Sequence, residues 1–342
     1  MYDSIPTIRY MGTKTKLLNY IIPCIDSVTP KNGTVCDIMA GSNAVSYALK
    51  RNYSVYTNDI QKYSEVISNA LIINQDTVIS SISAKEDLYD LYIFNLQEQE
   101  FDYFKKTYSG TYFSENQCCS IDSIRYSISK VQDKNKFNLY LLALMNAMCK
   151  VQSTPGHFAQ FMPSTHKRII PLQNMDVWDE FLKSCNYYSD ITFSNFNNHC
   201  FCGDYKKLLI DDSLKNVDTI YLDSPYSQEQ YSRFYHILET IVKYDYPEVH
   251  FKAKYRDDRF MSDFCYKSKV LDEFKTILEY CNKTQKNLVI SYSTNGVLPH
   301  KELFEVCKLF FKNCKLEEIN YSHSTQGKGS NKIKEILITL SH

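Results

Sequence analysis

A strand–turn–helix–strand pattern within residues 33–60 constrains the fold of this 342-residue chain more than any other feature. The apolar run Thr34–Met39 leads into the small residues Ala40–Asn43. A helix-forming stretch, Ala44–Arg51, and a second apolar run, Ser54–Asp59, follow. Two strands joined by a helix within about thirty residues are the unit from which doubly wound sheets are built. We therefore expect an α/β fold of the Rossmann-like kind.

Three further apolar runs suit strands of the same sheet. They cover Asp218–Asp223, Asn287–Tyr292 and Ile336–Leu340, and helical patterns lie between them over Ser232–Lys243 and Ser268–Asn282. Alternating strands and helices are typical of an α/β domain. The sequence therefore predicts a doubly wound mixed sheet.

A long middle segment, residues 71–190, separates the early strands from the late ones. Helical patterns cover Ser120–Val131 and Lys136–Cys149 within it, and its composition does not support a long disordered linker. We interpret this segment as a mainly helical inserted domain. Residues 1–70 and 191–342 would then form one catalytic domain together.

The overall composition excludes several classes of protein. No run of about eighteen apolar residues occurs, so no membrane span is expected. The first ten residues lack the apolar stretch of a secretion signal, and we expect a cytoplasmic protein. The twelve cysteines form no pairs with zinc-site spacing, so we expect reduced thiols and no metal site.

Charge gives weak guidance about a nucleic-acid partner. The chain carries 39 basic and 39 acidic residues, whereas phosphate contacts require positive side chains. A local basic face matters more than the net charge. Candidates for such a face are Lys252, Lys254, Arg256, Arg259, Lys267, Lys269, Lys328, Lys332 and Lys334.

The turn after the first strand is a candidate ligand site. Its small residues at the start of a helix let the backbone approach a ligand closely, although a plain strand–helix turn is an open alternative. Asp59 ends the next strand, where a carboxylate can accept hydrogen bonds from two ribose hydroxyls. The repeated glycines of a dinucleotide site are absent. The pattern therefore favours S-adenosyl-L-methionine over NAD.

The tetrapeptide Asp223-Ser224-Pro225-Tyr226 follows an apolar run and suits chemistry on an aromatic amine. Such an amine is a poor nucleophile because its lone pair is delocalised into the ring. The Asp223 carboxylate and the Ser224 carbonyl could accept the two amine hydrogens and so localise that lone pair. Pro225 would stiffen the turn, and Tyr226 would stack on an extruded base. The tetrapeptide thus indicates methyl transfer to a base.

This tetrapeptide resembles the Asp/Asn-Pro-Pro-Tyr motif of the Dam-like group of DNA adenine methylases, with Ser224 in place of the first proline. The resemblance implies S-adenosyl-L-methionine as the cofactor and the N6 amine of adenine in double-stranded DNA as the target. It also implies that the middle segment recognises the target sequence. A cognate restriction endonuclease that acts on the same site is a further implied partner.

Other elements follow the order of that family. By resemblance, Tyr10 and Lys14 contact the methionine part of the cofactor, and Asp59 with Ile60 lies at its ribose. Asp204 and Tyr205 lie at its adenine. The cofactor loop comprises Asp37, Ala40, Gly41, Ser42, Asn43 and Ala44, with Asn43 where a glycine is common. Gln230–His236 resembles a segment near the target base, and Ser291–Gly296 resembles a loop beside the active site.

Several alternatives stay open from the sequence. The same fold could act on cytosine N4 or on adenine in RNA, and a catalytically silent DNA-binding subunit could retain it. His157 could contact DNA or pack within its loop. Arg125 could contact a phosphate or form a salt bridge.

Overall fold

The computed structural model describes the chain except for residues 1–6, 9–11, 164 and 320–333. Among the described residues, one seven-stranded sheet has the order β3-β2-β1-β4-β7-β9-β8. The first five strands in that order are parallel, and β9 is antiparallel to both of its neighbours. The strands are β1 (Thr34–Asp37), β2 (Ser54–Asp59), β3 (His199–Cys202), β4 (Thr219–Asp223), β7 (Asn287–Ser293), β8 (Asn313–Ile319) and β9 (Glu335–Ser341). The predicted mixed α/β sheet is confirmed.

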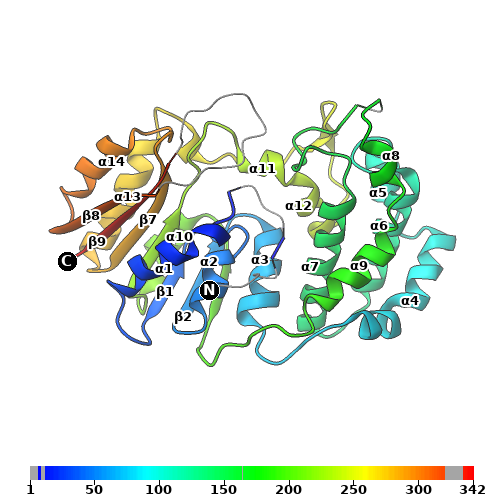
Figure 1. The fold of residues 1–342 in the computed structure, drawn as a ribbon, viewed down its shortest axis with the longest axis horizontal. Coiled ribbons are helices and arrows are strands. Elements are labelled where there is room, and N and C mark those ends of the chain that lie inside the picture. Colours follow the sequence, from blue (N-terminus) through cyan, green and yellow to red (C-terminus); the bar gives the residue numbers. More distant parts are fainter. Residues whose placement is uncertain (1–6, 9–11, 164, 320–333) are drawn as a thin grey trace.

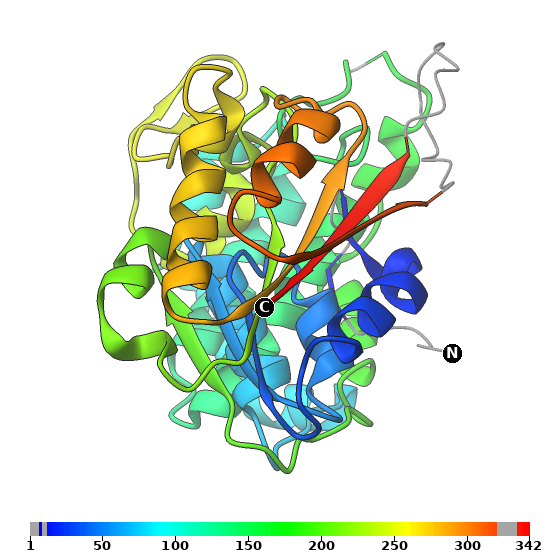
Figure 2. The ribbon, with the colours of Figure 1, turned by 90° about the vertical axis from the view of Figure 1, so that its left-hand side faces the viewer.

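Both faces of this sheet are buried because its strands are apolar on both sides. In β4, Ile220 and Leu222 join one hydrophobic cluster, whereas Tyr221 joins the other. Successive side chains point to opposite faces of a strand, so a continuous apolar run requires helices on both faces. The first cluster packs against α10 (Tyr205–Ile210), α13 (Val270–Lys283) and α14 (His300–Cys307). Figure 2 shows α13 and α14 in front of the sheet.

The opposite face packs against α1, α2 and α3, and beyond them lies a large helical layer (Figure 1). These helices are α1 (Leu18–Asp26), α2 (Ala44–Leu49) and α3 (Lys62–Ser68), followed by the π-helical turn Asn69–Ile73. The helical layer contains α4 (Ser81–Glu98), α5 (Tyr103–Tyr108), α6 (Glu115–Ser129), α7 (Lys134–Val151), α8 (Ile169–Gln173) and α9 (Val177–Asn186). All six lie between β2 and β3 in the sequence.

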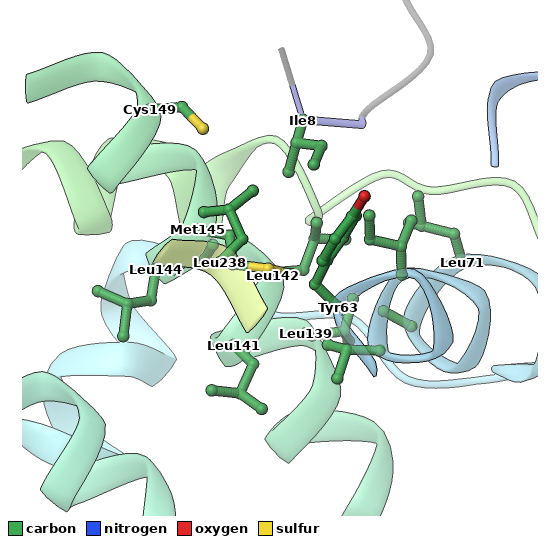
Figure 3. Packing of buried hydrophobic residues seen from close by; sticks show 14 of the residues in the cluster. Ile8, Tyr63, Leu71, Leu139, Leu141, Leu142, Leu144, Met145, Cys149 and Leu238 are labelled. Carbon is green, nitrogen blue, oxygen red and sulfur yellow. The ribbon is translucent and has the colours of Figure 1, made fainter. Parts of the chain in front are cut away.

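A helix from another part of the chain completes this layer. The short helix α11 (Tyr231–Phe234) and then α12 (His236–Lys243) follow β4, and α12 packs against α3 and α7. Figure 3 shows Tyr63 of α3, Leu142 of α7 and Leu238 of α12 within one buried cluster. The helical layer is therefore built from two separate stretches of chain. Boundaries at residues 71 and 190 remain predictions.

Some predicted elements differ from the observed ones. The helix expected over Ser232–Lys243 is divided at Tyr235, whose φ of −126° and ψ of 18° are not helical. The helix expected from Ser120 begins at Glu115, because Ser114 and Gln117 form a capping box there. Strands β3 and β8 were not expected, since both lie at sheet edges and contain polar residues.

The cysteines and helices agree with the expectations from composition. All twelve cysteines are free thiols, and eight are buried. Within the described ranges, no helix is both long and apolar enough to cross a membrane. The one group of described residues spaced to bind a metal ion is Glu248, His250 and Asp257, which is exposed and includes no cysteine. It lies at the small hairpin of β5 (Val249–His250) and β6 (Tyr255–Arg256).

Asn43 shapes the turn between β1 and α2. Its φ of 59° places it in the left-handed region, which asparagine tolerates better than most residues. Its buried amide donates to the Ser64 carbonyl at 3.2 Å and accepts from the Ser68 hydroxyl at 2.6 Å. Asn43 thus ties the turn to α3 and fixes the path of residues 40–42.

Replacing Asn43 with alanine should lower the free energy of unfolding by about 2–4 kcal/mol, because the variant loses buried hydrogen bonds and retains a left-handed backbone. Asn43→Gly should lower the free energy of unfolding by less, since glycine adopts a positive φ without strain. Urea denaturation measures both. The control is Asn32→Ala, because Asn32 has the same φ of 59° but is exposed. Equal losses at both positions would show that the buried hydrogen bonds contribute nothing.

Candidate active site

The carboxyl ends of β1, β2 and β4 open into one pocket. Asp37, Asp59, Asp204 and Asp223 all line it, although the first and last are far apart in sequence. Parallel strands present their carboxyl ends at one sheet edge, and the connecting loops there form ligand sites. The fold therefore brings the predicted cofactor segments and the predicted catalytic tetrapeptide to a common cavity.

Fourteen of the sixteen predicted site residues line this pocket: Lys14, Asp37, Ala40, Gly41, Ser42, Ala44, Asp59, Ile60, Asp204, Tyr205, Asp223, Ser224, Pro225 and Tyr226. Asn43 does not line it and instead holds the turn from behind. Tyr10 lies outside the described residues. The roles assigned to these side chains remain predictions, but the juxtaposition that those roles require is present.

Two backbone amides fix the orientation of the Asp59 carboxylate. Gly41 N donates to Oδ2 and Gln61 N donates to Oδ1, both at 2.9 Å. Burial nevertheless raises the pKa of Asp59 to about 6. Each carboxylate oxygen has a further lone pair with which it can accept a hydrogen bond. This geometry suits an acceptor for the hydroxyls of a ribose.

Asp37 is a buried carboxylate that is only partly satisfied. Ser46 Oγ donates to its Oδ2 at 2.6 Å, while Oδ1 has no hydrogen-bond partner in the described part of the chain. Burial raises the pKa of Asp37 to about 7, and the charges of Asp223 and Asp59 raise it further in the same direction. Such a group can accept a hydrogen bond from a cationic or amine donor of a ligand.

Asp223 lies beside a buried lysine. Lys14 Nζ is 3.1 Å from Asp223 Oδ1 and 3.1 Å from Glu335 Oε1. The same ammonium lies 5.3 Å from the centre of the Tyr226 ring. Burial raises the pKa of Asp223 to about 6, although the positive charge of Lys14 lowers it. Lys14 therefore helps to keep this carboxylate ionised near neutral pH.

The β3–α10 loop is held by its own side chains. Asp204 caps α10, and its Oδ1 accepts from Lys206 N at 3.0 Å. The Tyr205 hydroxyl donates to Glu273 Oε2 at 2.5 Å, and Lys206 Nζ lies 2.6 Å from Glu273 Oε1. These bonds fasten α10 to α13. The Tyr205 hydroxyl therefore has a structural partner, whichever part of the ring faces a ligand.

Sequence reasoning missed two residues that organise the pocket. Asn58 is buried, and its Nδ2 donates to the Ile38 and Gly203 carbonyls, both at 3.1 Å. It thereby joins the loops that follow β1 and β3. An asparagine inside an apolar strand, directly before Asp59, is a signal that could have revealed it. Glu335 gives no comparable signal, because it lies far from every motif in the sequence.

Arg125 and His157 have structural roles. Arg125 is buried, donates from Nε to the Ile241 carbonyl at 2.8 Å, and forms no salt bridge with the residues that the structure describes. It satisfies carbonyls near the end of α12. The His157 ring packs edge-on against Phe234 with centroids 5.0 Å apart, and its Nδ1 accepts from Ala159 N at 3.3 Å. The packing expected for His157 is confirmed.

Five of the nine basic residues named as candidates from the sequence contact other side chains or carbonyls of the protein. Arg256 is buried, with Asp245 at 2.7 Å and Asp258 at 2.8 Å. Lys254 donates to the Thr107 carbonyl. In addition, Lys269 pairs with Asp263 at 2.9 Å, Lys334 pairs with Glu318 at 2.8 Å, and Arg259 lies over the Tyr255 ring at 4.6 Å. Lys252 and Lys267 are exposed, whereas Lys328 and Lys332 fall outside the described ranges. Of the nine candidates, Arg256, Lys269 and Lys334 are therefore paired with carboxylates.

Comparison with known proteins agrees with this geometry. The chain is 28% identical over 97% of its length to modification methylase LlaI of Lactococcus lactis subsp. lactis, and covers 54% of that protein. It is 26% identical over 88% of its length to the type II methyltransferase M.FokI of Planomicrobium okeanokoites, and covers 47% of it. The chain thus spans about half the length of these curated relatives.

A shorter relative is covered more completely. The type II methyltransferase M.NlaIII of Neisseria lactamica is 24% identical over 89% of this chain and 89% of the relative. Residues 10–304 match the family model of D12 class N6 adenine-specific DNA methyltransferases, and this match includes the Ala40–Asn43 turn, the helical layer and the tetrapeptide Asp223–Tyr226. The chain belongs to the D12 class N6 adenine-specific DNA methyltransferase family.

Proposed function

We propose that this protein transfers the methyl group of S-adenosyl-L-methionine to the N6 amine of a flipped adenine in a specific double-stranded DNA sequence. The observation that carries this proposal is the single pocket shared by the Gly41 turn, Asp59, Asp223 and Tyr226. A donor seated at the first two and a base seated at the last two would meet inside it. Family membership supports the same reaction.

The residues present fit the cofactor. The Asp59 carboxylate would accept from the ribose hydroxyls, and Asp204 and Tyr205, which line the same pocket, would contact the adenine. Asp37 Oδ1 is buried without a partner among the described residues, which suits the ammonium of the methionine part. When bound, the cofactor supplies a methyl group activated by a positively charged sulfur.

The catalytic tetrapeptide would hold the target amine. Asp223 and the Ser224 carbonyl would accept its two hydrogens, which favours a pyramidal nitrogen with a localised lone pair. Tyr226 would stack on the extruded base. Ser224 is buried, and its hydroxyl has no hydrogen-bond partner among the described residues. A backbone carbonyl performs the proposed role at position 224, so the change from proline leaves that role intact.

The helical segment 71–190 would recognise the target sequence. We further propose a type II modification role with a restriction endonuclease that acts on the same site. Two relatives are named type II methyltransferases and another a modification methylase, which supports this role. Sequencing methylated DNA from cells that express the protein would identify the site.

Methyl transfer should be lost in Asp223→Ala while cofactor binding persists, because Asp223 acts on the target amine rather than on the cofactor. Tyr226→Ala should weaken capture of the base by about 1–3 kcal/mol. Tritium transfer from labelled S-adenosyl-L-methionine to duplex DNA measures the reaction, and calorimetry measures cofactor binding. The matched control is Asp212→Ala, because Asp212 is exposed and lies outside both the pocket and the helical segment.

Nucleoside analysis of the product separates the remaining chemistries. N6-methyladenine in DNA supports the proposal. N4-methylcytosine would show that the target is cytosine, and label in RNA would show that the substrate is RNA. A protein that binds the cofactor but labels no nucleic acid would be a silent subunit. If Asp223→Ala transferred methyl groups at the wild-type rate, the role proposed for the Asp223 carboxylate would be contradicted.

The transfer rate should fall as pH drops through about 6. Asp223 must be ionised to accept hydrogen bonds from the amine, and its pKa is raised to about 6 by burial. The ionised, active form therefore dominates above that pH and is lost below it. Single-turnover rates at saturating cofactor would show this acid limb. A flat profile through this range would contradict the requirement for an ionised Asp223.

A further inference from the structure

Three charged side chains from distant parts of the sequence meet beside the catalytic tetrapeptide. Lys14 Nζ lies 3.1 Å from Asp223 Oδ1 and donates a hydrogen bond of 3.1 Å to Glu335 Oε1. Lys14 is 3% exposed and Glu335 is 1% exposed, whereas the Asp223 side chain is 24% exposed. Glu335 is thus enclosed and does not line the pocket, whereas Lys14 and Asp223 both line it and Asp223 is the more exposed of the two.

Sheet topology explains why Glu335 reaches this site. Asp223 ends β4 and pairs with Ser291 of β7. Glu335 begins β9 and pairs with Ser293 of the same strand. Because β9 is antiparallel to β7, its first residue lies at the edge where the parallel strands end. Lys14, which precedes the 3₁₀ helix Thr15–Leu17, bridges from Asp223 to Glu335 at this edge.

We propose that Glu335 is a positioning residue for the Asp223 carboxylate and that it acts through Lys14. This inference rests on the proposed function, in which Asp223 accepts hydrogen bonds from the target amine. A lysine paired with Asp223 alone would move closer to that carboxylate and compete with the amine for its lone pairs. Because Glu335 also pairs with the Lys14 ammonium, Lys14 holds the Asp223 carboxylate in place without occupying all of its lone pairs. Asp223 can then still accept hydrogen bonds from the target amine.

The balance of charge around Asp223 agrees with this role. Burial raises its pKa, Lys14 lowers it and Glu335 raises it. Conversely, both carboxylates raise the pKa of Lys14 and keep it protonated despite burial. Among the described residues, the titratable or charged side chains that interact with Asp223 are Lys14 before the 3₁₀ helix, Asp37 of β1, Tyr221 of β4, Tyr226 of the following loop and Glu335 of β9.

Replacement of Glu335 by glutamine tests the inference with little change of shape. Glu335→Gln removes one negative charge, so that Asp223 becomes the carboxylate that pairs with the Lys14 ammonium. The midpoint for ionisation of Asp223 should therefore fall by roughly 0.5–1 pH unit. The acid limb of the transfer rate should move in the same direction, and the plateau rate should fall because the amine meets a weaker acceptor.

The ionisation midpoint is measured on the ligand-free protein. Carbon-13 labelling of aspartate carboxyls gives a titration for each side chain, and Asp223→Asn identifies the signal of Asp223. Glu318→Gln is the matched control, because Glu318 lies on the neighbouring strand β8, is 39% exposed and pairs with Lys334 instead. The control should leave the Asp223 midpoint and the transfer profile unchanged.

Two results would overturn the inference: an unchanged Asp223 midpoint in folded Glu335→Gln, or the same shift in Glu318→Gln. Should Glu335→Gln not fold, Glu335→Asp keeps the charge but withdraws it by one methylene. The ionisation midpoint of Asp223 should then shift by a smaller amount in the same direction. An unchanged midpoint in folded Glu335→Asp would overturn the inference. Absence of methyl transfer by the wild-type protein would refute the proposed function alone, since the titration requires neither cofactor nor DNA.

Discussion

Buried carboxylates at one edge of a parallel sheet are the constraint on which the rest of the site depends. Asp37, Asp59 and Asp223 each end a strand or follow its last apolar residues, and burial raises the pKa of all three. A raised pKa in the folded state means that the protonated form is favoured there. Their contribution to stability is therefore lost as pH rises through about 6 to 7. The ligand-free site is destabilised near neutral pH, where a cationic ligand would bind best.

The surrounding fold offsets this cost with local hydrogen bonds. Gly41 N and Gln61 N hold Asp59, and the Ser46 hydroxyl holds Asp37. Lys14 supplies a full positive charge to Asp223. These contacts orient the three carboxylates and favour their ionised forms, although the surrounding protein partly excludes water. Apolar packing on both faces of the sheet keeps the supporting strands rigid.

Sequence patterns predicted the strands whose own residues favour a buried strand and whose place in the sheet is buried on both faces. The runs at β1, β2, β4, β7 and β9 are apolar on both faces, and each was found within a residue or two of its observed bounds. The edge strands β3 and β8 carry polar residues, so their identity depends on the neighbours with which they pair. The break at Tyr235 likewise depends on tertiary packing that no local pattern encodes.

The same distinction applies to the site. Asp59, Asp223 and Tyr226 belong to short motifs whose spacing carries chemical meaning, and the structure places them in one pocket. Glu335 lies behind that pocket, at Lys14, only because β9 runs antiparallel to its neighbours, which a single sequence does not reveal. Among the candidate basic residues, burial likewise depends on the fold and not on the local sequence. Adjacent charges in the sequence suggested a free surface, whereas Arg256 is buried between two aspartates.

The place of α12 has a consequence for protein engineering. This helix follows the tetrapeptide Asp223–Tyr226 in the sequence, yet it packs against α3 and α7, and Arg125 of α6 satisfies carbonyls near its end. A chimaera that exchanged residues 71–190 alone with a relative would join a foreign helical layer to a native α12. The transplanted core would lack its own closing helix, so a workable exchange has to carry two stretches of chain.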